Sequence, residues 1–276
     1  MKTSLESVVS VVTTVWTLAN RFGLLGGAFE PNKRQMNYKL PKNSEKSAYV
    51  EQKFDEIAKQ YDRFNDLITF RMHRSWKRFV AEKTRLRSEG CCLDLCCGTG
   101  DIARTVKDNQ PEAIVTALDF SGNMLSLAIL RQESESEKIH FMRGDAMNPP
   151  FSTGHFDSVT VGFGLRNVPE LEKCVGIIYE LLKPSGILVS LDIGKVRFPI
   201  IRELNHIFLF RIVPFIGRRL MPGQEMFEYL PHSSLNYPDQ KTLKNLMLET
   251  GFKQVDVHDF VFGAACVHVA FKSFQT

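Results

Sequence analysis

The 276-residue sequence contains no uninterrupted run of about twenty apolar residues, the length that a membrane-spanning helix requires. Its nearest approach, Val8–Ala19, is broken by four hydroxyl side chains and is followed closely by Arg21. Three interpretations fit this N-terminus: a targeting or anchoring extension, an amphipathic surface helix, or a start assigned too early, with the true initiator at Met36. We expect residues 1–45 to form an extension outside the folded domain, which would occupy residues 46–276.

The chain also lacks a strong charge of one sign and any cysteine spacing typical of a disulfide framework or a zinc site. The net charge is +4 and the sequence pI is about 8.7, values too small to indicate nucleic-acid binding. Zinc ligands usually stand in pairs separated by two residues, whereas these cysteines are adjacent or isolated. We expect reduced thiols and no metal site. The six cysteines are Cys91, Cys92, Cys96, Cys97, Cys174 and Cys266.

What the sequence does contain is a glycine turn, Leu93–Asp101, which predicts a buried strand running through Gly-x-Gly into a helix. Asp94 lies inside this strand, and Asp119 follows the next apolar run, residues 113–118. Glycine lets backbone N–H groups approach a ligand without a Cβ in the way. An acid at the end of the following strand is placed to accept the two hydroxyls of a ribose. The pattern predicts a nucleoside cofactor at the edge of a parallel sheet.

Two cofactors fit the turn. Gly98-x-Gly100-x-x-Ala103 satisfies the dinucleotide fingerprint, and Asp119 would suit either cofactor. The carboxylate of Asp94, four residues before the first glycine, would repel a pyrophosphate but suits the sulfonium and ammonium of S-adenosylmethionine. Asp94 therefore favours the methyl donor. The alternative is that Asp94 only caps a neighbouring turn.

Strands and helices alternate through the middle of the chain. After a polar linker at residues 31–46, apolar spacing predicts helices around Val50–Tyr61 and Trp76–Val80. Strands are expected at residues 91–96, 113–118, 139–143, 156–161 and 187–191, and helices at 102–106, 122–131 and 171–182. Lys183-Pro184-Ser185-Gly186 is expected to stop the last of these helices. This alternation predicts a doubly wound parallel sheet with helices on both faces.

The C-terminal part follows another pattern. A helix at residues 243–248 precedes two strand-like runs, 254–258 and 266–271. Consecutive strands joined by a short loop pair antiparallel. We therefore predict an α/β fold with a mostly parallel seven-stranded sheet and a C-terminal antiparallel hairpin, the Rossmann-like layout of class I methyltransferases.

Several local motifs coincide with one family. The most specific are Tyr61-Asp62-x-x-Asn65-Asp66 and Gly164-Leu165-Arg166-Asn167-Val168, whereas the glycine turn and Lys183-Pro-x-Gly186 occur in many methyltransferases. His73–Lys77 and Tyr237–Gln240 also match. Over about residues 50–273 the chain resembles the ubiquinone/menaquinone C-methyltransferases, which methylate a ring carbon of a polyprenylated quinol. The resemblance implies an enzyme with S-adenosylmethionine as cofactor and says nothing about residues 1–45.

The resemblance also implies positions for the cofactor, in addition to Asp94, Gly98 and Gly100 from the glycine turn. It places Thr99 in that turn, Asp119 on the ribose, and Asp145 and Ala146 beside the adenine. Gly162 stands where the family often has serine, so a side-chain contact made there would be absent from this chain.

Arg166 and Asn167 are the active-site residues to which the resemblance points. Arginine is a poor proton acceptor because its pKa exceeds 12, so we assign Arg166 to phenolate stabilisation or water positioning. Its alternative role is a structural ion pair with a helix carboxylate. Tyr61 (catalytic, or only a core aromatic) and Asn65 are substrate-side candidates because a helix places i and i+4 on one face. His73 could contact substrate and relay a proton, or simply pack near Trp76.

Residues 196–236 form an apolar, arginine-containing segment between the fifth strand and the final hairpin. We expect a lid over a hydrophobic substrate. Peripheral contact with anionic lipid, or a helix packed on the core or on a second subunit, would explain the composition equally well.

The leading hypothesis is S-adenosylmethionine-dependent C-methylation of a prenylated quinol, with demethylmenaquinol preferred to a ubiquinone precursor. The alternatives are a methyltransferase acting on another small aromatic or lipid, and a catalytically silent scaffold in a quinone-synthesis complex. Besides the quinol, we expect peripheral membrane contact and a homodimer or such a complex, but no nucleic acid. The expected location is the cytoplasm or an organelle matrix, beside the membrane that carries the quinone.

Overall fold

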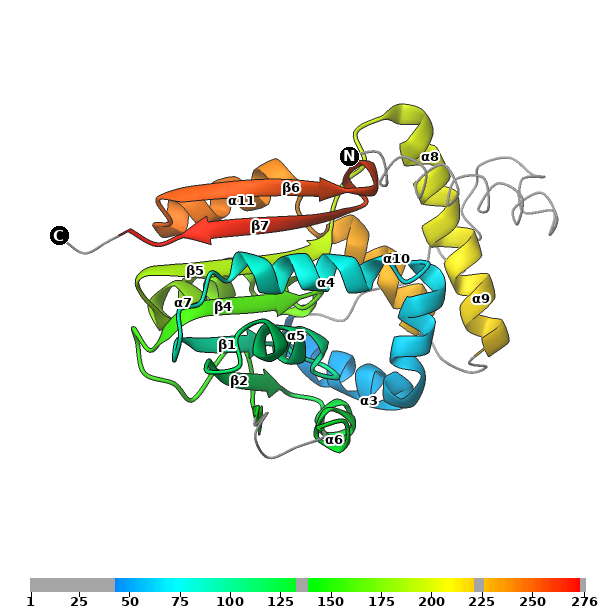
Figure 1. The fold of residues 1–276 in the computed structure, drawn as a ribbon. Coiled ribbons are helices and arrows are strands. Elements are labelled where there is room, and N and C mark those ends of the chain that lie inside the picture. Colours follow the sequence, from blue (N-terminus) through cyan, green and yellow to red (C-terminus); the bar gives the residue numbers. More distant parts are fainter. Residues whose placement is uncertain (1–42, 133–138, 221–225, 274–276) are drawn as a thin grey trace.

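The computed structural model describes residues 43–132, 139–220 and 226–273, so nearly all of the predicted N-terminal extension lies outside the described residues. A seven-stranded sheet with the order β3-β2-β1-β4-β5-β7-β6 forms its centre (Figure 1). Strand β7 runs antiparallel to both of its neighbours, and the other pairs are parallel. The predicted fold class is confirmed. The strands are β1 (Cys91–Leu95), β2 (Ile114–Asp119), β3 (His140–Arg143), β4 (Phe156–Gly162), β5 (Leu182–Ile193), β6 (Gln254–Phe260) and β7 (Ala265–Phe271).

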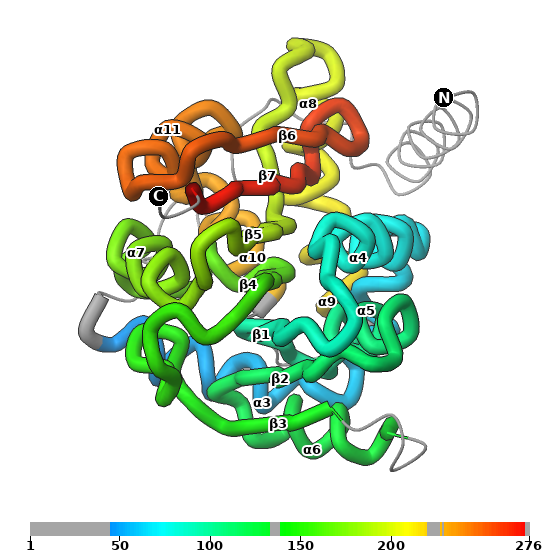
Figure 2. Tube along the Cα trace, turned by 60° about the vertical axis from the view of Figure 1, so that its left-hand side comes forward, coloured from blue at the N-terminus to red at the C-terminus, as the bar shows by residue number. Residues whose placement is uncertain are grey.

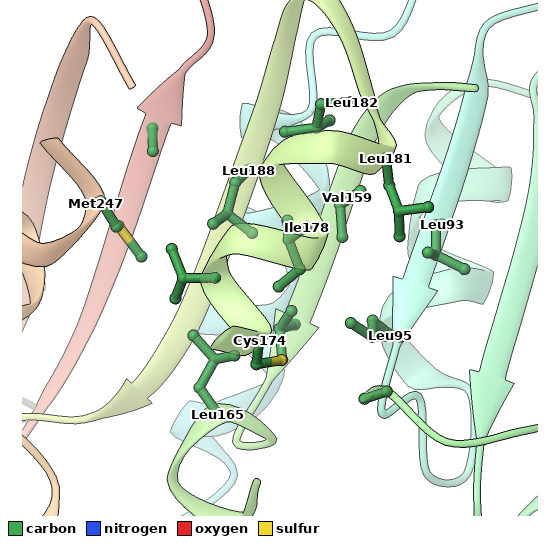
Figure 3. Close-up of a cluster of buried hydrophobic side chains, with 14 of the residues drawn as sticks. Leu93, Leu95, Val159, Leu165, Cys174, Ile178, Leu181, Leu182, Leu188 and Met247 are labelled. Carbon is green, nitrogen blue, oxygen red and sulfur yellow. The ribbon is translucent and has the colours of Figure 1, made fainter. Parts of the chain in front are cut away.

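Helices cover both faces of the sheet (Figure 2). On one face Ile178 and Leu181 of α7 pack with Leu93 and Val159 from the strands, and Met247 of α11 joins the same apolar cluster (Figure 3). Helices α4 and α5 bury a second cluster on the other face. The α3 helix packs against α6 beyond the sheet edge. These helices are α3 (Asn43–Ile68), α4 (Met72–Lys83), α5 (Asp101–Asn109), α6 (Gly122–Leu130), α7 (Leu171–Leu181) and α11 (Gln240–Thr250).

Two predicted boundaries are wrong. The helix before Lys183–Gly186 ends at Leu181, close to the predicted position, but the next strand, β5, begins at Leu182 and not at Ile187. The strand pairing shifts register between Phe156 and Ser158, and Ser185 adopts a φ of +64°, so the four residues are absorbed within the strand. The polar linker does not extend through Lys46, since α3 begins at Asn43. The Nζ of Lys46 donates to the carbonyl of Val168 at 2.8 Å, a tertiary contact that sequence spacing cannot reveal.

The predicted lid segment is helical and lies beyond the carboxyl ends of the parallel strands (Figure 1). It comprises α8 (Pro199–Ile207), the π-helix η3 (Phe208–Ile212), α9 (Val213–Leu220) and α10 (Met226–Asn236). Val213 and Phe227 from this segment pack on Phe64 of α3. No helix within the described ranges is long and apolar enough to cross a membrane.

The close packing of α9 against α10 makes Gly217 in α9 sensitive to substitution. A Cβ there would lie 2.1 Å from Cγ of Phe227, whose buried ring packs in a tilted arrangement against Phe64 at 4.6 Å between centroids. Gly217→Ala is expected to destabilise the fold by about 1–3 kcal/mol through overpacking, although alanine is the better helix former. Thermal unfolding measures this.

Gly176→Ala in α7 is the matched control, because among the described residues no atom beyond its chain neighbours and its own helix backbone lies within 4 Å of the added Cβ. This variant is expected to keep or raise stability, by up to about 1 kcal/mol. Equal melting temperatures for the two variants would contradict the packing described for α9.

Candidate active site

The carboxyl ends of β1, β2 and β4 bring three loops to one edge of the sheet, where ligands bind in open α/β folds. The glycine turn follows β1, Asp119 ends β2, and Phe163–Asn167 follows β4. Phe163 has a left-handed φ of +57°, as does Cys96 in the glycine turn, so both loops carry strained backbone at this edge. Three adjoining cavities open among these loops.

The first, which we call the cofactor cavity, encloses about 670 Å³ of empty space, part of it open to solvent. Gly98, Asp119, Asp145, Ala146 and Asn167 line it. The carboxylate of Asp119 is fixed by two backbone donors, the N–H of Gly98 at 2.7 Å and that of Ser121 at 2.9 Å. Burial raises the pKa of Asp119 to about 6. The structure thus gathers the residues predicted for ribose and adenine around one cavity.

A second, smaller space, which we call the turn cavity, encloses about 330 Å³ beside the glycine turn. Asp94, Thr99 and Lys77 are among its lining residues. Thr99 does not line the cofactor cavity, and its hydroxyl donates to Asp62 of α3 at 3.0 Å. Gly100 lines none of the three cavities. A Cβ on Gly100 would lie 2.9 Å from the Phe141 ring, so this glycine permits close packing where α5 begins.

Asp94 is fully buried and has two hydrogen-bond partners. Its Oδ1 accepts the Thr160 hydroxyl at 2.8 Å, and its Oδ2 accepts the N–H of Ala103 in the first turn of α5 at 3.1 Å. Burial raises the pKa of this carboxyl to about 7. Asp94 therefore does cap a neighbouring helix, as the alternative interpretation held, and it also lines the turn cavity.

The third space, which we call the apolar cavity, encloses about 1360 Å³ between α3, α4 and the helices α8, η3 and α10, part of it open to solvent. Its walls are mainly aliphatic and aromatic, including Ile57 and Trp76 on one side and Leu204 and Phe208 on the other. A few polar side chains interrupt this surface: Asn65, Thr69, His73, Arg166 and Asn205. Tyr61 and Phe163 line all three cavities, so these two residues mark the junction.

Arg166 is buried in the wall of the apolar cavity. Its Nη1 lies 2.6 Å from Oδ1 of Asp192, at the end of β5, and its backbone N–H reaches the other carboxylate oxygen at 3.2 Å. The partner is therefore a strand carboxylate and not the helix carboxylate considered from the sequence. The Nε of Arg166 is buried and has no hydrogen-bond partner among the described residues. The side chain thus retains one donor for a ligand.

Sequence reasoning missed Asp192, although the signal was present. Asp192 closes the apolar run Ile187–Leu191, just as Asp119 closes the run in β2. An acid at the end of a buried strand was the pattern that singled out Asp119, and the same pattern applied to β5 would have singled out Asp192 as a candidate site residue.

Asn167 lines the cofactor cavity and is held by two hydrogen bonds. Its Nδ2 donates to the carbonyl of Phe163 at 3.0 Å, and its Oδ1 accepts the hydroxyl of Tyr229 at 3.1 Å. Tyr229, in α10, was not identified from the sequence. Through Asn167, helix α10 is connected to the loop after β4.

Tyr61, Asn65 and His73 all line the apolar cavity, and the first two share a face of α3 as their spacing predicted. The Nδ1 of His73 lies 2.7 Å from the Thr69 hydroxyl. Burial, with a smaller contribution from Lys77, lowers the pKa of His73 to about 4, so its imidazole is neutral at physiological pH. A neutral imidazole beside a hydroxyl can donate to, or accept from, a polar group of a bound ligand.

Comparison with known proteins identifies the family. Residues 42–272 match the ubiE/COQ5 methyltransferase family. A demethylmenaquinone methyltransferase of Leptospira interrogans is 44% identical over 241 residues, covering 85% of this chain and 97% of that protein. One from Staphylococcus epidermidis is 35% identical over 235 residues, covering 84% of this chain and 97% of that protein.

Solved structures agree on the fold. An S-adenosylmethionine-dependent methyltransferase from Thermotoga maritima, a possible histamine N-methyltransferase, superposes with a TM-score of 0.57 at 19% identity, covering 80% of this chain and 99% of that one. At this identity the likeness shows the fold alone. Because the family match spans most of the sequence and its relatives align over nearly their whole length, this chain belongs to the ubiE/COQ5 methyltransferase family.

Proposed function

We propose that this protein transfers a methyl group from S-adenosylmethionine to a ring carbon of demethylmenaquinol, giving menaquinol. The observation that carries the proposal is the meeting of a cofactor cavity and a large apolar cavity at Tyr61 and Phe163. A methyl donor in the cofactor cavity and a hydrophobic aromatic ring in the apolar cavity would face each other at this junction. The names of the relatives from Leptospira and Staphylococcus support the choice of ring.

The residues present fit S-adenosylmethionine. Asp119 can accept two ribose hydroxyls, and Asp145 and Ala146 can border the adenine. When bound, the cofactor supplies an electrophilic methyl on a sulfonium. The ionised carboxylate of Asp94 favours such a positive group, and a pyrophosphate would be repelled there.

The chemistry requires the reduced ring. A quinone carbon is electrophilic, whereas a quinol carbon beside an ionised hydroxyl is nucleophilic. Arg166, with an unpaired Nε in the wall of the apolar cavity, is placed to donate to that oxygen and stabilise its negative charge. The apolar walls would hold the prenyl chain and keep water away from the part of the cavity that it fills. Fixing both reactants in line can lower the barrier by about 7–11 kcal/mol.

Peripheral membrane contact forms part of the proposal. Phe198 and Ile200, at the start of α8, are 58% and 79% exposed. Their neighbours Ile201 and Leu204 line the apolar cavity. A membrane surface over the start of α8 would cover the exposed pair and give a prenyl chain a short path into the cavity.

Affinity for S-adenosylmethionine is expected to increase as the pH rises through about 6 and about 7, the raised pKa values of Asp119 and Asp94. The carboxylate of Asp119 would bind the ribose hydroxyls, and that of Asp94 the positively charged part of the cofactor, more tightly when ionised. Asp94→Asn should remove the upper part of this dependence and weaken binding by about tenfold or more, the loss of a charge-assisted contact. Calorimetric titration between about pH 5 and about pH 8 measures both effects.

The same variant should be more stable than the wild type at about pH 8. The pKa of Asp94 is higher in the folded chain than in the unfolded chain, so the folded state loses stability as the pH rises toward about 7 and ionises the buried group. Asparagine cannot ionise and so avoids this loss of stability. The melting temperature is expected to rise by about 2–4 °C for each kcal/mol of unfolding free energy gained. The exposed Asp108→Asn variant is the control and should change neither property. Unchanged binding by Asp94→Asn would remove Asp94 from the cofactor site.

The function is tested with methyl-labelled S-adenosylmethionine and two reduced prenylated substrates, a demethylmenaquinol and a methoxy-benzoquinol, supplied separately and then in competition. We expect label in the naphthoquinol, with little in the benzoquinol. Label in both would indicate a dual enzyme. Cofactor binding without transfer would favour another aromatic or lipid substrate, and absence of binding would favour the scaffold.

A further inference from the structure

We propose that Lys77 binds the carboxylate of the methionyl end of S-adenosylmethionine in the turn cavity. This proposal rests on the proposed function, because it assigns the part of the cofactor that the ribose and adenine residues do not hold. Lys77 was not among the site residues expected from the sequence.

The turn cavity is the space into which the methionyl end can extend. Cys96, Gly98, Gly162, Phe163 and Tyr61 line both the turn cavity and the cofactor cavity, so the two are continuous past the glycine turn. A nucleoside with its ribose on Asp119 would place its sulfur near this shared wall. The third substituent of that sulfur, an aminobutyrate carrying one ammonium and one carboxylate, would then enter the turn cavity.

The charged groups of the turn cavity match such a zwitterion. Asp94 and Asp101 supply carboxylates, and Lys77, on α4, supplies a buried ammonium. An ammonium of the ligand would face the acids, and its carboxylate would face Lys77. A purely cationic or purely anionic ligand would leave one side of this cavity without a partner.

Lys77 has capacity for a second anion. Its Nζ lies 2.7 Å from Oδ2 of Asp101, but Arg104 also donates to the other oxygen of that carboxylate at 2.9 Å. Asp101 is thus shared between Lys77 and Arg104, and the ammonium of Lys77 has three donors, of which Asp101 takes one. A carboxylate on Lys77 would form a charge-assisted hydrogen bond in a site shielded from water, where such bonds are strongest.

The competing explanation is that Lys77 only ties α4 to the start of α5. Decarboxylated S-adenosylmethionine separates the two explanations, because it keeps the adenosine, sulfonium and ammonium and lacks only the carboxylate. The wild-type protein is expected to bind S-adenosylmethionine at least about tenfold more tightly than this analogue at constant ionic strength. Lys77→Met should bind the two ligands within about twofold of each other, and Lys77→Arg should retain part of the preference.

Lys107→Met is the matched control, since Lys107 donates to the carbonyl of Ala113 and lines none of the three cavities. It should keep the wild-type ratio. A Lys77→Met variant that also keeps the wild-type ratio would overturn the proposal. If that variant fails to fold, the wild-type ratio decides alone, because equal affinity for both ligands contradicts a carboxylate contact.

No quinol is present in this experiment, so its outcome is independent of the substrate assignment. Equal binding of both ligands would remove Lys77 from the site and leave the proposed methyl transfer standing. Absence of binding by either ligand would overturn the cofactor assignment and this proposal together.

Discussion

Replacing Arg166 by lysine is expected to lower kcat by about 10²- to 10³-fold, the usual cost of losing one preorganised donor to a developing negative charge. Lysine keeps the positive charge but loses the planar fork, which holds Asp192 through Nη1 while leaving Nε free. The affinity for S-adenosylmethionine should change little, because Arg166 does not line the cofactor cavity. Single-turnover transfer at saturating cofactor measures the chemical step.

The exposed Arg78→Lys variant controls for the substitution itself and should turn over at the wild-type rate. The pH–rate profile adds a readout that a merely structural role would not move. If Arg166 stabilises the phenolate, the variant should need a higher pH to reach its maximum rate. Wild-type turnover in Arg166→Lys would defeat the assigned role.

Replacing Asp192 by alanine should destabilise the fold by about 3–5 kcal/mol, because it leaves the guanidinium of Arg166 buried without its counter-charge. Both side chains are almost fully excluded from solvent, at 5% and 2% exposure. The backbone N–H groups of Arg166 and Ile193 also lose an acceptor. Chemical denaturation at neutral pH gives the free energy of unfolding directly.

An exposed pair of nearly the same length provides the comparison. The Nζ of Lys183 lies 2.7 Å from Oδ2 of Asp157, with both side chains well exposed, and Lys183→Met should cost at most about 1 kcal/mol. A larger loss of stability in Asp192→Ala than in Lys183→Met would show that burial of the ion pair causes the difference. Similar losses for the two variants would show that Arg166 does not depend on Asp192 for its burial.

The fold could be predicted from the sequence because its strands are short, continuous apolar runs separated by strong turn residues. Ile114–Asp119 and Ala265–Phe271 were each located to within one residue. The start of β5 was predicted too late, at Ile187, because Lys183–Gly186, which follow the end of α7, are taken into the strand by a shift in pairing that depends on the neighbouring strand. Local residue types predict where a helix ends, but they do not predict which neighbouring strand pairs with the residues that follow.

The active site likewise contains residues that the sequence predicted and contacts that only the tertiary structure reveals. Asp119, Gly98 and Asp145 meet at one cavity, as motif reasoning predicted, because carboxyl ends of parallel strands share an edge. The ion pair Arg166–Asp192 and the hydrogen bond Asn167–Tyr229 join residues 26 and 62 positions apart, so no local pattern reveals that these residues are partners, although the place of Asp192 at the end of an apolar run could have singled that residue out. Lys77 is similar: its spacing on α4 predicts only a helix face, and the cavity it lines exists because α4 packs beside the glycine turn.

Methyl transfer to a ring carbon is best tested by locating the transferred methyl in the product. S-adenosylmethionine carrying a ¹³C methyl group is incubated anaerobically with the protein and demethylmenaquinol, and carbon–proton correlation spectra of the product locate the label. We expect a methyl bonded to a ring carbon, formed with one equivalent of S-adenosylhomocysteine and only from the reduced ring. A methyl ether, or equal transfer to the oxidised quinone, would contradict it.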